Sequence, residues 1–176
     1  MRSAFVSMLA LALAVLLCAC LSTEPVWETV DDDLVCAAPD PAKPYAITFC
    51  VPEDALEQTL SADTSARVYL GAGGGYEIVS DVLACAEPMD AVQQLTGFAP
   101  SQLELVTTTR FGMPEYQFAW SASGDEGARI YRAAILSDGS YCYTLCFSSA
   151  AGLGGTYDSI QQQVFSSFGL YGDENF

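Results

Sequence analysis

The chain has 176 residues, 51% of them hydrophobic, and its 22 acidic residues against six basic ones give a formal net charge of −16. This charge argues against a nucleic-acid partner, because phosphate binding needs clustered lysine and arginine. The absence of histidine excludes Ser-His, Cys-His and His-metal chemistry. The length predicts about one domain.

The N-terminus predicts an export signal. Arg2 precedes an apolar run, Ala4–Leu17, that is shorter than the roughly 20 residues of a bilayer-spanning helix. The following Leu17-Cys18-Ala19-Cys20 resembles the bacterial lipobox. The resemblance implies that residues 1–19 are removed as a lipoprotein signal peptide and that Cys20 carries a diacylglyceryl thioether, with or without a further acyl chain such as palmitate. Two or three chains suffice for stable anchoring to the outer face of the cell membrane. An ordinary secretory signal is the alternative.

Residues 20–44 are predicted to form the lipidated N-terminus and an acidic tether. The segment contains Pro25, Pro39, Pro41, Pro44 and the triplet Asp31-Asp32-Asp33, and it lacks apolar periodicity. The triplet lacks the alternating ligands and turn glycine of a calcium loop, so we expect no metal there.

Residues 45–172 are predicted to form the folded domain. Residues 45–51 alternate apolar and polar residues as a strand does, and residues 52–60 begin with proline and acids as a short helix does. Residues 66–70 and 76–83 read as a hairpin joined by the glycine-rich residues 71–75. A second helix is predicted between Glu87 and Gly97.

The second half of the domain predicts antiparallel strands and a closing helix. Strand-like runs span residues 103–109, 116–120, 128–136 and 140–148, and Asp138-Gly139 predicts a tight hairpin turn before the last of them. That last strand has apolar residues on both faces, which predicts that both faces of the sheet are covered. The closing helix is predicted over residues 157–168, with Thr156 as N-cap and Gly169 as its stop.

This order of elements is similar to the PsbP-like fold of the photosystem II extrinsic subunit, its eukaryotic nuclear-transport relative and many bacterial lipoproteins. The opening Tyr45–Asp54, the strand Gly139–Phe147 and the helix Tyr157–Phe168 carry the resemblance. It implies an α+β fold in which helices flank both faces of a central, mainly antiparallel sheet of about six strands. It also implies a binding or assembly role, and it transfers no ligand residue.

Three arginines are candidates for an anion pocket: Arg110, Arg129 and Arg132. Because Arg129 and Arg132 point to opposite faces of one strand, we expect local salt bridges instead. The glycine segments 71–75 and 152–155 lack the Gly-Lys-Ser/Thr ending of a phosphate loop and are predicted to be turns. No pair of carboxylates is singled out for catalysis.

Five cysteines besides Cys20 remain after processing: Cys36, Cys50, Cys85, Cys142 and Cys146. Cys142 and Cys146 lie about 13 Å apart along one strand, too far to pair with each other, and we expect both to be buried thiols. The state of Cys36, Cys50 and Cys85 stays open, a Cys36–Cys85 bridge being one option.

The sequence thus predicts a lipid-anchored extracytoplasmic binding or assembly module of the bacterial envelope, with a protein or envelope polymer as partner. The alternative is a small carboxylate-dependent envelope hydrolase. We expect no cofactor, no metal and no catalytic residues. Removing residues 1–19 takes away Arg2 and no acid, so the acidity belongs to the exported part, which predicts neutral or cationic partners.

Overall fold

A computed structural model describes residues 44–60, 64–124 and 127–172. Its centre is a seven-stranded sheet in the order β2-β3-β4-β8-β7-β6-β5, and every pair of neighbours in it is antiparallel. A separate two-stranded sheet joins β1 and β9, the first and last strands of the described region.

The strands are short at the edges of the sheet and long at its centre. They are β1 (Ala46–Thr48), β2 (Leu56–Glu57), β3 (Arg67–Leu70), β4 (Tyr76–Ala84), β5 (Val106–Arg110), β6 (Met113–Gly124), β7 (Gly127–Ser137), β8 (Tyr141–Ala150) and β9 (Gly169–Tyr171). The helices are α2 (Pro88–Thr96) and α3 (Asp158–Ser166), and short 3₁₀ turns span Ala72–Gly74, Pro100–Gln102 and Ala151–Tyr157.

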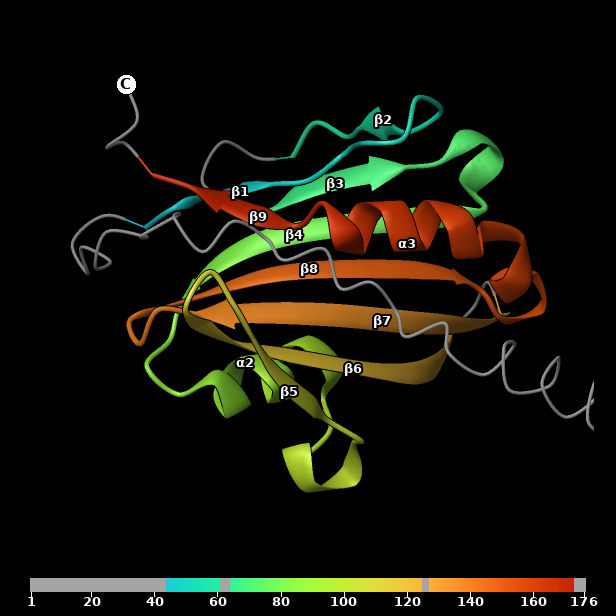
Figure 1. Cartoon of the computed structure of the whole chain (residues 1–176). Coiled ribbons are helices and arrows are strands. Elements are labelled where there is room, and N and C mark those ends of the chain that lie inside the picture. Colours follow the sequence, from blue (N-terminus) through green and yellow to red (C-terminus); the bar gives the residue numbers. More distant parts are fainter. Residues whose placement is uncertain (1–43, 61–63, 125–126, 173–176) are drawn as a thin grey trace, which may run out of the picture. The chain divides into compact units, whose positions relative to one another are not determined.

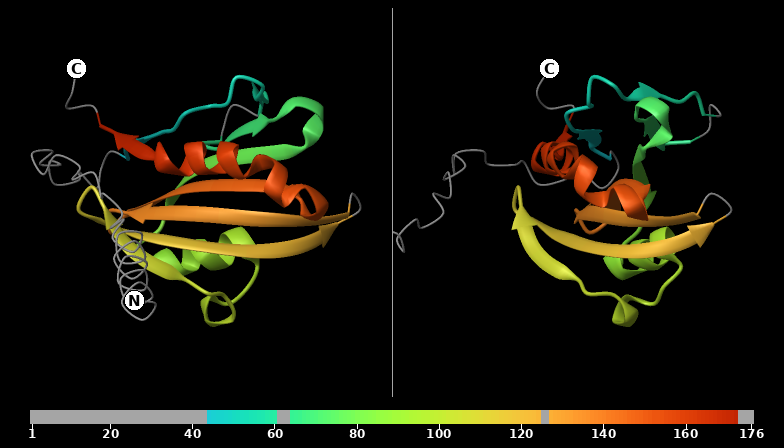
Figure 2. Two further views of the ribbon diagram at one scale, coloured as in Figure 1. Left: turned by 45° about the vertical axis from the view of Figure 1, so that its right-hand side comes forward. Right: turned by 90° about the vertical axis from the view of Figure 1, so that its right-hand side faces the viewer.

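The two helices cover opposite faces of the large sheet (Figures 1 and 2). On one face, α3 and the β1–β9 pair enclose a core that includes Tyr76, Tyr143, Phe147 and Val164. On the other face, α2 covers a smaller core built around Val92, Phe118, Ile135 and Cys142. Both faces of β8 are therefore buried, as the sequence predicts.

Elements with strong local signals form as predicted. The hairpin β3–β4 is confirmed. Helix α2 begins at Pro88 and is capped after Thr96 by Gly97, whose φ of 74° places it in the left-handed conformation that favours glycine. The turn between β7 and β8 is also confirmed, one residue later than predicted. Asp138 N–H donates to the Tyr141 carbonyl, which makes Gly139 and Ser140 the central residues. The Asp138 carboxylate accepts hydrogen bonds from the N–H groups of Ser140 and Tyr141 and from the Tyr143 hydroxyl, and so fixes the turn.

The sheet is larger, and the helices fewer, than predicted. The helix expected over residues 52–60 is wrong: Ala55 N–H closes a turn on the Pro52 carbonyl, and Leu56–Glu57 form the edge strand β2. Among the described residues, Leu56 and Leu60, two apolar side chains of that expected helix, are 71% and 40% exposed. This edge strand raises the sheet to seven strands instead of six.

The boundaries of the closing helix also differ from the prediction. Helix α3 starts at Asp158 after a 3₁₀ turn, and neither Thr156 nor another side chain caps it. Gly169 is not a helix stop but the first residue of β9. Its missing side chain has a packing reason, because a Cβ there would lie 3.1 Å from the Thr48 hydroxyl on β1. The predicted strand 45–51 correspondingly shortens to β1, which pairs with β9 and not with the large sheet.

Candidate ligand-binding cleft

A cleft of about 440 Å³ with a mixed polar and apolar lining lies between α3 and the neighbouring strands β5, β6 and β7. The strands contribute Arg110, Gln117, Arg132 and Ala133, and the helix contributes Asp158, Gln161, Gln162, Phe165 and Ser166. This cleft combines charged, amide and aromatic side chains, and it is the candidate functional site of the described residues.

The helical wall of the cleft follows directly from helix geometry. Asp158, Gln161, Gln162, Phe165 and Ser166 recur at intervals of three and four residues, so they form one stripe along α3. Ile160 and Val164 lie on another side of the helix, in the core. Helix α3 therefore buries one face and offers a mostly polar face to the cleft.

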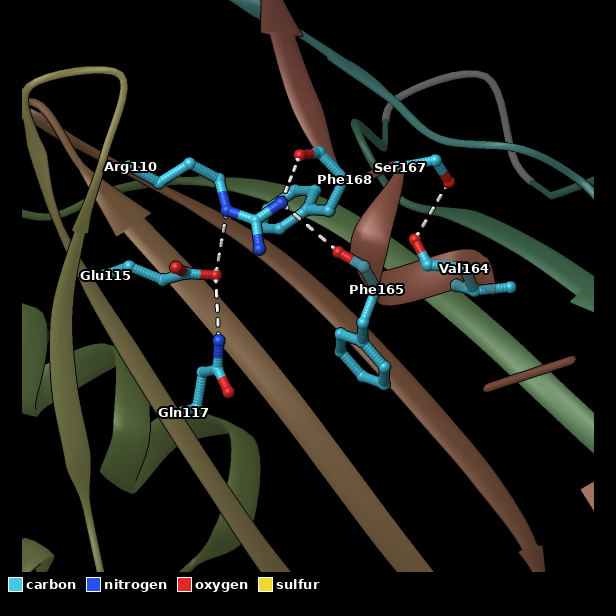
Figure 3. A network of polar contacts seen from close by, with 7 residues as sticks. All are labelled: Arg110, Glu115, Gln117, Val164, Phe165, Ser167 and Phe168. Carbon is cyan, nitrogen blue, oxygen red and sulfur yellow. Dashed lines mark hydrogen bonds and ion pairs between the residues drawn. The ribbon is translucent and has the colours of Figure 1, made fainter. Parts of the chain in front are cut away.

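Arg110 joins the sheet to the end of α3 (Figure 3). It ends β5, immediately before a two-residue turn in which Phe111 and Gly112 both have positive φ, the geometry of a tight hairpin. Its Nη1 donates hydrogen bonds to the carbonyl oxygens of Phe168 at 2.8 Å and Phe165 at 3.2 Å. These carbonyls lie at and just beyond the C-terminal end of α3, where the last carbonyls have no partner within the helix; the Phe165 carbonyl also accepts from the Phe168 N–H at 3.3 Å.

The same guanidinium neutralises a buried carboxylate on β6. Arg110 Nε lies 3.2 Å from Glu115 Oε1, and Glu115 is only 2% exposed. Gln117 Nε2 donates to the same Oε1 at 3.2 Å (Figure 3). Among the described residues nothing accepts a hydrogen bond from Nη2 of Arg110. The floor of the cleft is thus an ion pair in which the two N–H donors of Arg110 Nη2 have no acceptor among the described residues.

Arg132 brings a second positive charge to the cleft, and this charge is not part of the Arg110–Glu115 network. It lies opposite Ala119 on β6, which makes Gln117 its diagonal neighbour on the same face of the sheet. Its side chain is exposed, and within the described part of the chain it has no hydrogen bond or ion pair. Asp158 lies on the helical wall of the cleft, but no salt bridge joins it to either arginine in that same part.

The structure separates the three arginines that the sequence singles out. Arg110 and Arg132 share the cleft, whereas Arg129 points to the opposite face, where it donates to the hydroxyl and carbonyl oxygens of Ser148. The predicted opposition of Arg129 and Arg132 is confirmed. The expected local salt bridge is found for Arg110 with Glu115. Among the described residues Arg129 bonds to Ser148, and its expected salt bridge stays a prediction.

The glycine segments are connections, as predicted. Residues 71–75 join β3 to β4, and 152–155 lie in the 3₁₀ turn before α3. Two glycines in the first segment make room for aromatic rings: a Cβ at Gly71 would lie 2.2 Å from the Tyr76 ring, and one at Gly75 would lie 2.0 Å from the Tyr157 hydroxyl. The glycines at positions 71 and 75 are thus explained by close packing against the rings of Tyr76 and Tyr157.

The described cysteines are free thiols with different surroundings. Cys142 is buried as predicted, whereas Cys146 is half-buried. Burial raises the pKa of both thiols to about 12. Cys85 is half-buried and Cys50 exposed. Cys20 and Cys36 lie outside the described residues. Within the described ranges, no three His, Cys, Asp or Glu side chains gather to hold a metal ion.

The cleft does not favour the hydrolase alternative. Glu115 is buried and already engaged by Arg110 and Gln117, so its carboxyl group does not face a substrate as a general acid must. Asp158 lines the helical wall without a neighbouring carboxylate among the lining residues.

In the described part of the chain, no helix has the length and apolar character needed to cross a membrane.

Comparison with solved structures defines the fold as PsbP-like. Cyanobacterial PsbP (CyanoP) from Synechocystis sp. PCC 6803 matches with a TM-score of 0.51 and 17% identity, over 72% of this chain and 87% of that one. LpqN, involved in cell envelope biogenesis of Mycobacterium tuberculosis, matches with a TM-score of 0.51 and 18% identity, over 76% of this chain and 87% of that one. No family model and no curated protein sequence matches this chain significantly.

Proposed function

We propose that the protein is a lipid-anchored, extracytoplasmic binding module of the bacterial cell envelope, not an enzyme, and that the cleft beside α3 is its binding site. The lipobox-like Leu17–Cys20 supports lipidation of Cys20, and residues 21–44 then act as a tether. The PsbP-like fold is shared with LpqN, which is itself involved in envelope biogenesis. The anchor keeps the domain outside the cell membrane, where envelope polymers are within reach.

The ligand group we assign to Arg132 is a carboxylate. Guanidinium groups bind carboxylates through two parallel hydrogen bonds, and these charge-assisted bonds are about twice as strong as neutral ones. A phosphate would bring more negative charge than the cleft can balance, because Arg110 is already paired with Glu115 and Asp158 adds a negative wall. A single carboxylate matches Arg132, the arginine of the cleft that has no partner among the described residues.

The remaining lining suits a saccharide. Gln117, Gln161 and Gln162 each offer an amide that both donates and accepts, as sugar hydroxyls do. Phe165, half-buried beside them, offers an apolar surface for the C–H face of a sugar ring. We therefore propose an acidic saccharide unit of an envelope polymer as the ligand.

One observation carries the proposal. In a chain with a net charge of −16, two of the described arginines converge on one cleft, and Arg132 among them has no protein partner in the described residues. A cation left unpaired in so acidic a protein points to an anionic ligand. For the cleft, this proposal differs from the sequence-based expectation of neutral or cationic partners, which stays a prediction for the rest of the acidic surface.

Nuclear magnetic resonance can locate the ligand. The ¹⁵N-labelled full-length chain, with Cys20→Ser to prevent lipidation, is titrated with glucuronate and, as matched neutral control, with glucose. We expect glucuronate to shift the side-chain amides of Gln117, Gln161 and Gln162, and glucose to shift them far less. Equal shifts by both sugars, or shifts confined to the opposite face around Arg129, would contradict the proposal. Shifts caused equally by N-acetylglycine would point to a peptide carboxylate instead of a saccharide.

The anchor is tested separately. Mass spectrometry of the native chain is expected to show a mature N-terminus at an acylated Cys20, and Cys20→Ala is expected to leave residues 1–19 attached. A mature chain that begins at any other residue would rule out lipidation.

A further inference from the structure

Two cysteines lie side by side where β4 leads into α2. Leu83 on β4 pairs with Cys142 on β8, and Ala84 pairs with Tyr141. The ladder then continues for one more residue, because Cys85 N–H donates to the Ser140 carbonyl at 2.9 Å. Side chains alternate along a strand, so Cys85 follows Leu83 on the same face and is the diagonal neighbour of Cys142.

Their sulfur atoms are directed toward the same small region. Cys142 Sγ lies 3.7 Å from the Cys85 carbonyl oxygen, and the two side chains interact with each other. Cys85 Sγ donates to the Glu87 carbonyl at 2.9 Å, at the start of α2. Cys142 is fully buried, whereas Cys85 is half-buried at the rim of the core beneath α2. One thiol of the pair can thus be reached from solvent.

The other described cysteines have no comparable partner. Cys146 lies four residues along β8, opposite Val79 on one side and Ala133 on the other. Cys50 is exposed beside the end of α3, where its N–H donates to the Ser167 hydroxyl. The cysteines of the described residues therefore offer one close pair.

We propose that Cys85 and Cys142 form a disulfide under oxidising conditions, such as those outside the cell membrane, by exchange with a low-molecular-weight disulfide. The inference rests on the extracytoplasmic location proposed above, since such bonds persist in oxidising compartments. The bridge would tie the start of α2 to the centre of the sheet across 57 residues of sequence.

The chemistry balances in two exchange steps. The Cys85 thiolate attacks one sulfur of the oxidant, forming a mixed disulfide and releasing one thiol after protonation. Cys142 then loses its proton, attacks the Cys85 sulfur, and releases the second thiol. Two cysteine thiols are oxidised to one disulfide, and the oxidant disulfide is reduced to two thiols. Burial raises the pKa of Cys142 to about 12, so the second step is slow in the completed fold and faster before α2 has docked.

Peptide mapping of the full-length chain with Cys20→Ser tests this pairing. The reduced, folded protein is placed in excess oxidised glutathione, its remaining thiols are alkylated, and it is digested without reduction. Trypsin places Cys85 in a peptide between Arg67 and Arg110, and chymotrypsin cleavage after Tyr143 separates Cys142 from Cys146. Exchange is run to equilibrium in both conditions, because the second step is slow in the completed fold. We then expect a Cys85–Cys142 cross-linked peptide at least about tenfold more abundant than in urea, where closing the 57-residue loop costs entropy.

Matched variants distinguish this bridge from others. Cys85→Ala and Cys142→Ala are each expected to abolish the cross-link and free the partner thiol, while Cys146→Ala and Cys50→Ala leave it intact. A Cys36–Cys85 peptide, or alkylation of both Cys85 and Cys142 in the oxidised protein, would overturn the proposal. Because the buffer replaces the cellular compartment, this failure would bear on the cysteine pair and not on the proposed location.

Discussion

Replacing Arg110 by methionine should destabilise the domain more than any other loss of a single positive charge among the described residues. The change keeps the apolar stem but removes the ion pair with Glu115, which is 2% exposed, and both hydrogen bonds to the carbonyls of Phe165 and Phe168. An uncompensated buried carboxylate would remain on β6, and the end of α3 would lose its attachment to β5.

The magnitude follows from the burial of the pair. Removing one partner of a buried ion pair costs about 3–5 kcal/mol. The Arg110 side chain is 24% exposed, and Gln117 still donates to Glu115, so the lower end of about 3 kcal/mol applies. The two carbonyls, partly rehydrated, add about 1 kcal/mol. The total of about 4 kcal/mol corresponds to a shift of about 2 M in the urea midpoint for an m-value of about 2 kcal/mol/M.

Urea unfolding of the full-length chain, followed by tryptophan fluorescence and circular dichroism, measures this loss. Arg132→Met is the matched control, because it removes the same charge from the same cleft without a protein partner, and should cost less than about 0.5 kcal/mol. Adding Glu115→Gln to Arg110→Met should restore about 2 kcal/mol by removing the unpaired charge. Equal costs for Arg110→Met and Arg132→Met, or no recovery in the double variant, would refute the reasoning.

Three further predictions concern packing and the cysteines. Gly75→Ala should cost about 1–3 kcal/mol in urea unfolding, because its Cβ would lie 2.0 Å from the Tyr157 hydroxyl, whereas exposed Gly152→Ala, with nothing within 4 Å, should be near neutral. Reducing the Cys85–Cys142 bridge should lower the free energy of unfolding by about 4 kcal/mol, as expected for a loop of 57 residues, and an unchanged stability would contradict the bridge. In the reduced protein, Cys142 has a folded-state pKa raised from 9.0 to about 12, so its contribution is fully present below pH 9 and is lost as the pH rises toward 12. Unfolding measured across this range should show a shallower loss for Cys142→Ala than for the unsubstituted chain, and equal slopes would contradict the assignment.

Local chemistry made much of the fold predictable. Pro88 and Gly97 mark the two ends of α2 because each sets the backbone conformation at its own position. Asp138-Gly139 marks a hairpin turn for the same reason, since Gly139 has a positive φ. The sequence predicts Gly169 as a helix stop, which is wrong because the role of this glycine depends on a close contact with Thr48, a residue distant in sequence. The helix expected over residues 52–60 is replaced by β2 because Leu56 and Glu57 pair with β3. Contacts distant in sequence decided both cases.

The candidate site was predictable only in part. The sequence singled out Arg110 and Arg132, but their shared face depends on the register of β5, β6 and β7, which no local signal fixes. The polar stripe from Asp158 to Ser166 was visible as a helical spacing, and it would have indicated a second, uncovered side of α3. Its position above the arginines could not be predicted, because it follows from how the helix packs on the sheet.

The affinity of the cleft for glucuronate, compared across charge variants, tests the central claim most directly. We expect Arg132→Ala to weaken binding by about 10–100-fold, since a charge-assisted hydrogen bond contributes about 1.5–3 kcal/mol. Arg132→Lys should recover part of the loss. Arg67→Ala, which removes the same charge from β3, separated from β7 by β4 and β8, should leave the affinity unchanged. Equal affinities for the unsubstituted chain and Arg132→Ala, or an equal loss in Arg67→Ala, would contradict the assignment of the cleft as an anion-binding site.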